Sequence, residues 1–224
     1  MKKKYYLFKI NINLLNIVSL ILLLVMFIFT NIFFPDFLYK AFNGKSGLIF
    51  LILLVPYLLL HELLHGFSYV IHGAKFKNIT FGAHLEKGVL CCLCKQNINK
   101  KNIMLSLIYP FFFIGVITYF LGFYFKNYLL MLLSIMNIGG CSGDLIMFFN
   151  FLKLKNIEYS EYDDPISFGL YSENDLSKIK MVGLEYVDSS YTLKRNDLKK
   201  IFISRKSIYI FILLIVLLII LTLI

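Results

Sequence analysis

Long apolar runs limit what this chain can fold into more than any other feature of its sequence. Of its 224 residues, 59% are hydrophobic and 16% are charged, whereas soluble domains average roughly 45–50% apolar and about 25% charged residues. About 20 apolar residues suffice to cross the hydrocarbon core of a bilayer, and they must be helical because lipid offers no partner to an unpaired backbone group. The sequence predicts five spans, at about residues 14–34, 48–71, 103–125, 128–151 and 207–224.

The predicted fold class is an all-α polytopic membrane protein with about five transmembrane helices and two small additions. The first addition is the loop at residues 77–90, where polar and apolar residues partly alternate and Gly82 and Gly88 can form turns. This pattern predicts a small β-hairpin on the cytoplasmic side. The second addition is a small α+β segment before the last helix. We therefore expect three parts: a membrane-embedded core at 1–152, a cytoplasmic mini-domain at 153–206 and a C-terminal transmembrane helix at 207–224.

The mini-domain is predicted from charges of both signs and from short apolar stretches. Residues 166–171 and 184–187 are predicted strands. The stretch from Ser172 to Asp175 resembles a capping box, which predicts a short helix that ends at Lys180.

The distribution of lysines predicts the orientation in the membrane. Four lysines precede the first span and six lie in the loop at 72–102, whereas the opposite loops carry few. Because loops rich in lysine stay in the cytoplasm, we expect a multi-pass protein of the cell membrane with its N-terminus inside and its C-terminus outside. The net charge of +10 fits contact of these loops with the anionic headgroups of the lipid bilayer. We expect no nucleic acid partner, because the sequence contains no Arg-rich patch interleaved with aromatic residues.

The second span contains ionisable residues at a spacing that is typical of a metal site. His61 and His65 are four residues apart, so their imidazoles share one helix face and can bind one Zn2+ ion at about 2.0–2.1 Å per nitrogen. Glu62 lies beside His61 and can act as general base on a water whose pKa the metal lowers toward roughly 7. Ionisable groups inside a span are costly unless they are paired, and a bound dication removes that cost. The alternative is a hydrogen-bonded polar patch between helices.

A catalytic zinc ion usually has three protein ligands and one open position, so a third ligand is needed. Asp144 is the candidate, because it is the only acidic residue in the other four predicted spans. With a rise of about 1.5 Å per residue, His61 and Asp144 come to similar depths in the cytoplasmic half of the membrane. Glu86, in the loop after the second span, is the alternative third ligand.

Three further features lie near these residues in the sequence. Asn137 precedes Asp144 by two helical turns and can orient a scissile carbonyl or stabilise an oxyanion, although a packing hydrogen bond between helices is its alternative role. Pro110 is expected to kink the third span near its cytoplasmic end. A second, structural metal site is a further alternative, with the candidate ligands Cys91, Cys92, Cys94 and His84.

On these residues the chain resembles the site-2 protease class of intramembrane metallopeptidases, in which a His-Glu-x-x-His helix pairs with an aspartate on a later span. More closely, it resembles a bacterial family of membrane zincin peptidases of uncharacterised function, over roughly residues 48–185. The resemblance implies that His61, His65 and Asp144 bind zinc and that Glu62 is the base. It rests on residues 61–66, 81–95, 110 and 142–144.

The chain also departs from the site-2 pattern. No proline separates Asn137 from Asp144, and Leu145 stands where that class usually has glycine. No insertion resembling a PDZ domain is visible, so substrate selection is expected to differ from that of relatives that carry one.

We therefore expect an intramembrane zinc metallopeptidase whose partners are the bilayer and a membrane-protein or peptide substrate. Two other classes use the same residues. A non-catalytic metal-bound protein that binds or chaperones membrane partners does not require a base, so the intact Glu62 argues against it. A metal transporter or sensor needs a chain of polar residues through the membrane, and the third and fifth predicted spans contain no acidic residue or histidine.

Overall fold

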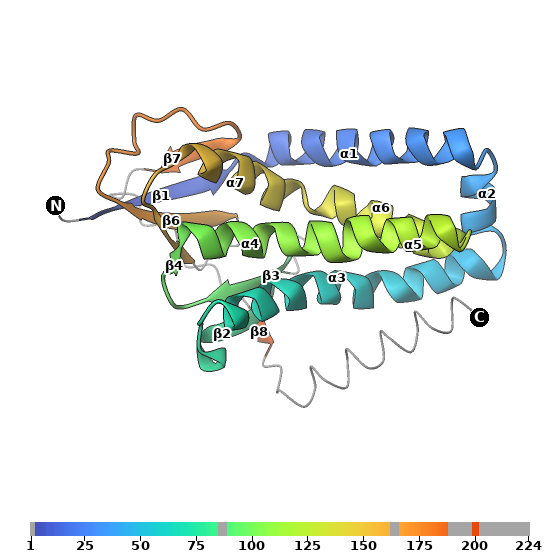
Figure 1. The fold of residues 1–224 in the computed structure, drawn as a ribbon, viewed down its shortest axis with the longest axis horizontal. Coiled ribbons are helices and arrows are strands. Elements are labelled where there is room, and N and C mark those ends of the chain that lie inside the picture. Colours follow the sequence, from blue (N-terminus) through green and yellow to red (C-terminus); the bar gives the residue numbers. More distant parts are fainter. Residues whose placement is uncertain (1–2, 85–88, 162–165, 188–198, 202–224) are drawn as a thin grey trace. The chain divides into compact units, whose positions relative to one another are not determined.

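The computed structural model describes residues 3–84, 89–161, 166–187 and 199–201 (Figure 1). Its helices are α1 (Ile12–Phe33), α2 (Phe37–Phe42), α3 (Lys45–Ile71), α4 (Lys100–Pro110), α5 (Thr118–Tyr124), α6 (Tyr128–Gly140) and α7 (Ser142–Lys153), with a short 3-10 helix η1 (Phe76–Asn78) and a π-helix η3 (Phe111–Ile117). Its strands are β1 (Lys4–Ile10), β2 (Ile79–His84), β3 (Val89–Cys94), β4 (Ile98–Asn99), β5 (Glu158–Glu161), β6 (Ser167–Ser172), β7 (Leu184–Val187) and β8 (Lys199–Ile201).

The chain divides into two compact units, each built from separate segments. Unit 1 comprises Met1–Leu15, Glu62–Ile108 and Gly143–Phe202, and it holds all of the strands given above. Unit 2 comprises Asn16–His61, Tyr109–Ser142 and Ile203–Ile224, and its described part is helical. Helix α3 passes without interruption from one segment to the next, so the spacing of its successive turns is set by helix geometry alone.

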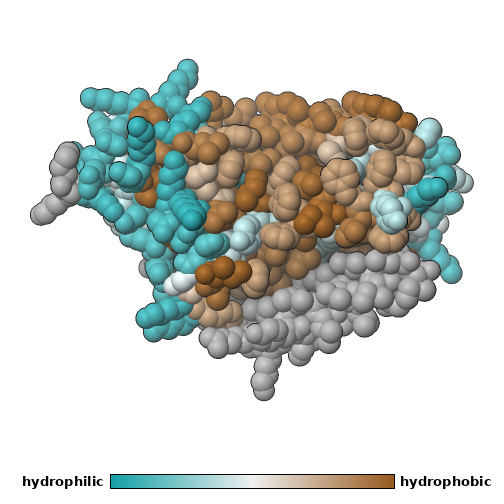
Figure 2. Space-filling view, in the orientation of Figure 1, coloured by the Kyte–Doolittle hydropathy of each residue, from teal (hydrophilic) through white to brown (hydrophobic). Residues whose placement is uncertain are grey.

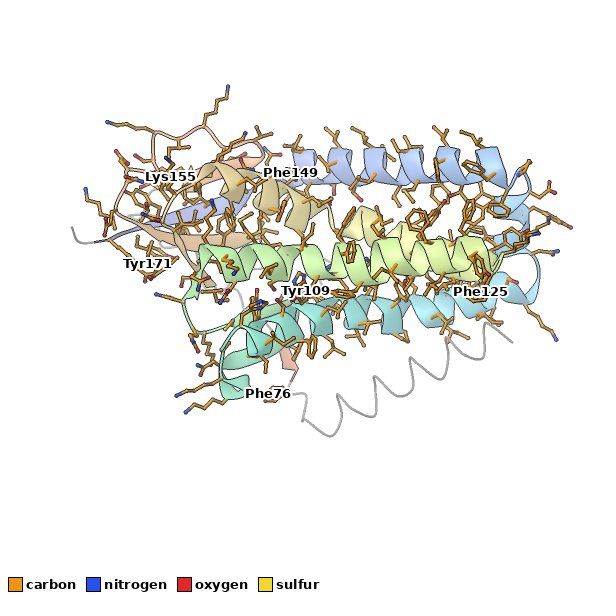
Figure 3. The ribbon with its side chains drawn as sticks, viewed as in Figure 1. Phe76, Tyr109, Phe125, Phe149, Lys155 and Tyr171 are labelled. Carbon is orange, nitrogen blue, oxygen red and sulfur yellow. The ribbon has the colours of Figure 1, made fainter. Side chains whose placement is uncertain are left out.

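Three helical stretches are long and apolar enough to cross a membrane, namely α1, α3 and the stretch Lys100–Tyr124 formed by α4, η3 and α5. The helices of unit 2 present a mostly hydrophobic surface, whereas the strands of unit 1 carry hydrophilic surface (Figure 2). Large apolar side chains are exposed on the helical segments, including Phe125, directly after α5, and Phe149, on α7, which are labelled in Figure 3. So much exposed apolar surface suits lipid and not water. The chain is therefore a membrane protein, and its first three predicted spans coincide with these helices.

The fourth predicted span, at residues 128–151, is not one straight helix. Helices α6 and α7 together are apolar enough to cross a membrane, but they meet at a bend of 48°. The bend lies at Cys141, directly after Gly139 and Gly140, and glycine is a poor helix former. As a result Asp144 lies in the first turn of α7. The fifth predicted span, at 207–224, lies outside the described residues.

The prediction of an all-α fold is wrong, because the described chain contains two antiparallel sheets. One has five strands in the order β4-β5-β6-β1-β7, and the other has three in the order β3-β2-β8. Residues 4–10 look in the sequence like a lysine-rich flank of the first span. They form β1, which pairs with β6 on one side and β7 on the other (Figure 1). Because Tyr6, Leu7 and Phe8 are all buried there, the strand lacks the alternation that normally reveals one.

The shorter predicted elements were right for the strands and wrong for the helix. The strands predicted at 166–171 and 184–187 are confirmed as β6 and β7, and the predicted hairpin corresponds to β2 and β3. The helix predicted to follow Ser172 is absent from the described residues there. The Ser172 hydroxyl accepts from the N–H of Asn174, and the carboxylate of Asp175 accepts from the hydroxyl and N–H of Ser177. These side chains stabilise turns in place of a helix, and the donors on Ser177 hold the pKa of Asp175 below its usual range.

Candidate metal centre

His65, on helix α3, is held by a backbone oxygen and faces a carboxylate. Its Nδ1 lies 3.0 Å from the carbonyl oxygen of Ser106, and its Nε2 lies 3.5 Å from Oδ2 of Asp144. A carbonyl can only accept a hydrogen bond, so Nδ1 must carry the proton. The lone pair of the neutral ring is therefore on Nε2, on the side of Asp144. The two side chains are only 10% and 16% exposed.

His61, one turn earlier on the same helix, is held in the same tautomer by a side chain. Its Nδ1 lies 2.9 Å from Oδ1 of Asn137. The Asn137 amide nitrogen donates to the carbonyl of Pro110 at 3.1 Å and lies 3.6 Å from the sulfur of Cys141. Since Pro110 offers only an acceptor, the nitrogen of the Asn137 amide must point to it and the oxygen to His61. His61 consequently donates through Nδ1 and also carries its lone pair on Nε2.

Together these residues form a group with the chemistry of a metal site. The ligand atoms of His61, His65 and Asp144 all lie within 4.8 Å of one another. Two ligand atoms on one tetrahedral zinc ion, each about 2.0–2.2 Å from it, are roughly 3.4 Å apart. The 3.5 Å between His65 and Asp144 matches that separation. Two imidazole nitrogens and one carboxylate oxygen are a donor set that zinc accepts, so the residues present fit this ion.

The two side chains predicted to be catalytic, those of Glu62 and Asn137, lie on different helices. Glu62 directly follows His61 on α3, and it is half-buried. Asn137 is buried on α6, and its amide holds His61 and the carbonyl of Pro110. The structure thus gives Asn137 a contact with a candidate ligand, and its predicted action on an oxyanion stays a prediction.

The alternative ligands proposed from the sequence are only partly described. Glu86 and the side chain of His84 lie outside the described residues. Cys91, Cys92 and Cys94 lie on β3, where successive side chains point to opposite faces. Across the described residues, the group at His61 is the one set of three or more such side chains whose ligand atoms converge, and it contains no cysteine.

Sequence reasoning missed the backbone partners of this site. The carbonyls of Ser106 and Pro110 hold the histidines directly or through one side chain. A backbone carbonyl has no residue-type signature, so only an indirect signal could have revealed it. That signal is the proline at 110, which lacks the N–H that would otherwise occupy the carbonyl four residues earlier.

By fold and site, the molecule is a membrane protein in which the ligand atoms of two histidines and an aspartate lie close together. A comparison with family models is consistent with this class: residues 52–159 match the family described as "Putative zincin peptidase". The matched segment contains all three candidate ligands and Glu62, and the predicted resemblance to a zincin peptidase family is confirmed. The match supports a metallopeptidase kind of function, and a zincin family implies zinc as the cofactor. No curated protein and no solved structure matches the chain at a significant level.

Proposed function

We propose that the chain is an intramembrane zinc metallopeptidase that hydrolyses peptide bonds of membrane-associated substrates. The observation that carries this proposal is that Nδ1 of each histidine lies within hydrogen-bond distance of an acceptor oxygen, which assigns both rings the same tautomer. Each donates its Nδ1 proton to an oxygen, so the Nε2 lone pairs of both belong to the group that Asp144 completes. A patch that merely joined helices would not require both rings to be held in this way. Outer hydrogen bonds of this kind accompany metal-binding histidines in general.

Each residue of the group has a distinct task in this proposal. His61, His65 and Asp144 would hold the zinc ion, which supplies a Lewis acid to the reaction. Glu62 would be the general base, a role supported by its position directly after His61 on α3. It would accept a proton from the attacking water and pass it to the leaving amine.

A membrane substrate is favoured by the apolar surface of α3 on both sides of the group. Leu58 is exposed before the ligands, and Phe67, Val70 and Ile71 are exposed after them. At a rise of about 1.5 Å per residue, the helix continues about 9 Å beyond His65 before it ends. The ligands would therefore lie at membrane depth, and a substrate helix would have to unwind locally to present its carbonyl. The lysine distribution supports a cytoplasmic N-terminus in the same proposal.

The test is a comparison of new protein N-termini in membranes that contain the wild type or Glu62→Gln. Peptides that begin within or beside a transmembrane segment should appear with the wild type only, because the variant retains the ligands but lacks the base. His72→Ala is the matched control, since His72 directly follows α3 and its Nδ1 lies near the carbonyl of Ser68, outside the metal group. This control should cleave as the wild type does.

Two results would contradict the proposal. Equal cleavage patterns for the wild type and Glu62→Gln, with zinc bound in both, would favour the non-catalytic alternative, a metal-bound protein that binds or chaperones membrane partners. Zinc accumulation in sealed vesicles in proportion to wild-type protein would favour a transporter.

A further inference from the structure

The third apolar stretch, Lys100–Tyr124, is not a regular α-helix. Helix α4 ends at Pro110, and the next seven residues form the π-helix η3 before α5 begins. A π-helix is rare and usually marks a functional position. Proline inside a transmembrane helix also needs compensation, because a carbonyl one turn away loses its donor and lipid cannot replace it. The question is what occupies the carbonyls around this break.

The first such carbonyl belongs to Ser106. In a regular α-helix it would accept from the N–H of residue 110, but Pro110 has no N–H. Ser106 is fully buried, and its carbonyl accepts from Nδ1 of His65 at 3.0 Å. The proline therefore makes room for the hydrogen bond that orients a candidate metal ligand.

The second and third carbonyls follow at intervals of one turn. The carbonyl of Pro110 accepts from the amide nitrogen of Asn137, whose oxygen holds His61. The carbonyl of Ile114, within η3, accepts the hydroxyl proton of Tyr57 at 2.7 Å. Acceptors four residues apart form one row along a helix. The α3 residues that these carbonyls serve are spaced in the same way: His65 and Tyr57 contact a carbonyl directly, and His61 does so through Asn137.

Tyr57 also joins the π-helix to α6 beside Asn137. Its hydroxyl lies 2.7 Å from the Thr118 hydroxyl and 3.3 Å from that of Ser134. Thr118 and Ser134 are themselves 2.7 Å apart. Ser134 precedes Asn137 by three residues on α6, so this cluster of hydroxyls lies next to the amide that holds His61.

We propose that the proline and π-helix of the third stretch serve to present backbone carbonyls, directly to His65 and through the Asn137 amide to His61. Pro110 and Tyr57 are then positioning residues that act through Ser106, Pro110's own carbonyl and Asn137. Because a carbonyl accepts only, the device fixes both rings with the proton on Nδ1. This inference rests on the metal site of the proposed function, but it concerns the rings themselves and can be measured without metal.

The sharpest test is Pro110→Ala. The new N–H at position 110 can donate to the carbonyl of Ser106 and displace His65, so the change repairs the helix and weakens the site. We expect zinc affinity to fall about 10- to 100-fold, the usual effect of losing an outer partner of a metal ligand. The melting temperature of the metal-free protein should not fall. Pro56→Ala is the matched control, since Pro56 also lies inside an apolar helix and should leave zinc affinity within about twofold.

A second pair of variants tests the positioning role at Ile114, the other end of the row of carbonyls. Tyr57→Phe removes only the hydroxyl that joins η3 to α6, and we expect zinc affinity to fall about tenfold. Tyr119→Phe removes a buried hydroxyl of the same kind, which bonds to Thr30 at 2.8 Å outside the row. It should cost similar stability and leave zinc affinity unchanged.

The histidine tautomers of the metal-free protein distinguish positioning from a general structural effect. If the variants only destabilised the fold, the tautomers would stay unchanged. The chain has four histidines, so 15N-histidine labelling gives a simple spectrum in which the Nδ1 and Nε2 signals report the tautomer. The wild type should show the Nδ1–H form for His61 and His65. His65 should lose it in Pro110→Ala and His61 in Tyr57→Phe, while both controls keep it.

The outcomes separate this inference from the proposed function. Zinc bound by the wild type, with unchanged tautomers and affinities in Pro110→Ala and Tyr57→Phe, would overturn the inference and leave the metallopeptidase in place. Altered tautomers in a protein that binds no zinc would support the positioning device and contradict the proposed function.

Discussion

Gly66 directly follows the second histidine, and its missing side chain lets the hairpin pack against α3. A Cβ at this position would lie 2.9 Å from the ring end of Phe81 and 3.2 Å from the sulfur of Cys92. Phe81 and Cys92 face each other across β2 and β3, and both are buried. The glycine is therefore required for close approach of a strand pair to the helix that carries the ligands.

We predict opposite effects for two glycine substitutions in helices. Gly66→Ala should lower the free energy of unfolding by about 1–2 kcal/mol, because overpacking outweighs the gain in helix propensity. Gly140→Ala is the matched control: nothing lies within 4 Å of the new methyl group, so stability should stay the same or rise by up to about 1 kcal/mol. Reversible unfolding in mixed micelles measures both. Equal effects would show that the hairpin does not pack tightly on α3.

The role of Asn137 can be determined by measuring zinc affinity and turnover separately. Its amide oxygen lies 2.9 Å from Nδ1 of His61, so Asn137→Ala should lower zinc affinity about 10- to 100-fold. If the residue acted on an oxyanion instead, zinc affinity would stay unchanged and only kcat would fall, by about 100-fold or more. Chelator competition on the purified protein, followed by cleavage at saturating zinc, distinguishes the two.

At this scale the sequence predicted the chemistry of the site better than its hydrogen bonds. His61, His65 and Asp144 were found because ionisable side chains are conspicuous in apolar runs and helix spacing relates them. The contact between Asn137 and His61 was not found, because an amide can serve a substrate or a neighbouring ring equally well. The roles of these residues as ligands and of Glu62 as base remain predictions.

Among the elements, α7 is joined to the chain before β7 by one buried side chain. The Asn150 amide donates to the carbonyl of Val182 at 2.8 Å and accepts from the N–H of the same residue at 2.9 Å. It thereby bonds both backbone groups of Val182 as a strand partner would. Asp144, in the first turn of the same helix, depends on the placement of α7.

We predict that Asn150→Ala lowers the free energy of unfolding by about 1–3 kcal/mol, since two backbone groups of Val182 lose buried partners. Asn78→Ala serves as a control, because Asn78 makes an exposed hydrogen bond to Gln96 and should change stability by less than about 0.5 kcal/mol. Thermal unfolding of the metal-free protein is the measurement. A loss as small as that of the control would mean that water replaces the Asn150 contacts.

Elements were predictable where one signal dominated. Helices α1 and α3 begin and end within about three residues of the predicted spans, because apolar length alone defines them. Strand β1 was missed because its pairing partners come from residues 167–172 and 184–187, and no local pattern announces so distant a pairing. The bend between α6 and α7 was missed because adjacent glycines read equally well as a close helix contact.

At the scale of the whole molecule, bound zinc should stabilise the folded state against unfolding. A ligand at 100 times its dissociation constant adds about 2.7 kcal/mol to the folded state. We therefore predict that zinc raises the melting temperature of the wild type and that chelation reverses the rise. Asp144→Ala should show little response to either treatment. An equal response in Asp144→Ala would place the stabilising metal elsewhere in the chain.

The central claim is that His61, His65 and Asp144 bind one zinc ion, and metal content by mass spectrometry tests it most directly. The account predicts one zinc ion per chain in the purified wild type and in Glu62→Gln, and loss of that ion in His61→Ala and Asp144→Ala. Zinc kept in Asp144→Ala would return Glu86 as the third ligand. No metal in the wild type, after purification in the presence of zinc, would contradict the account and leave the group as a polar contact between helices.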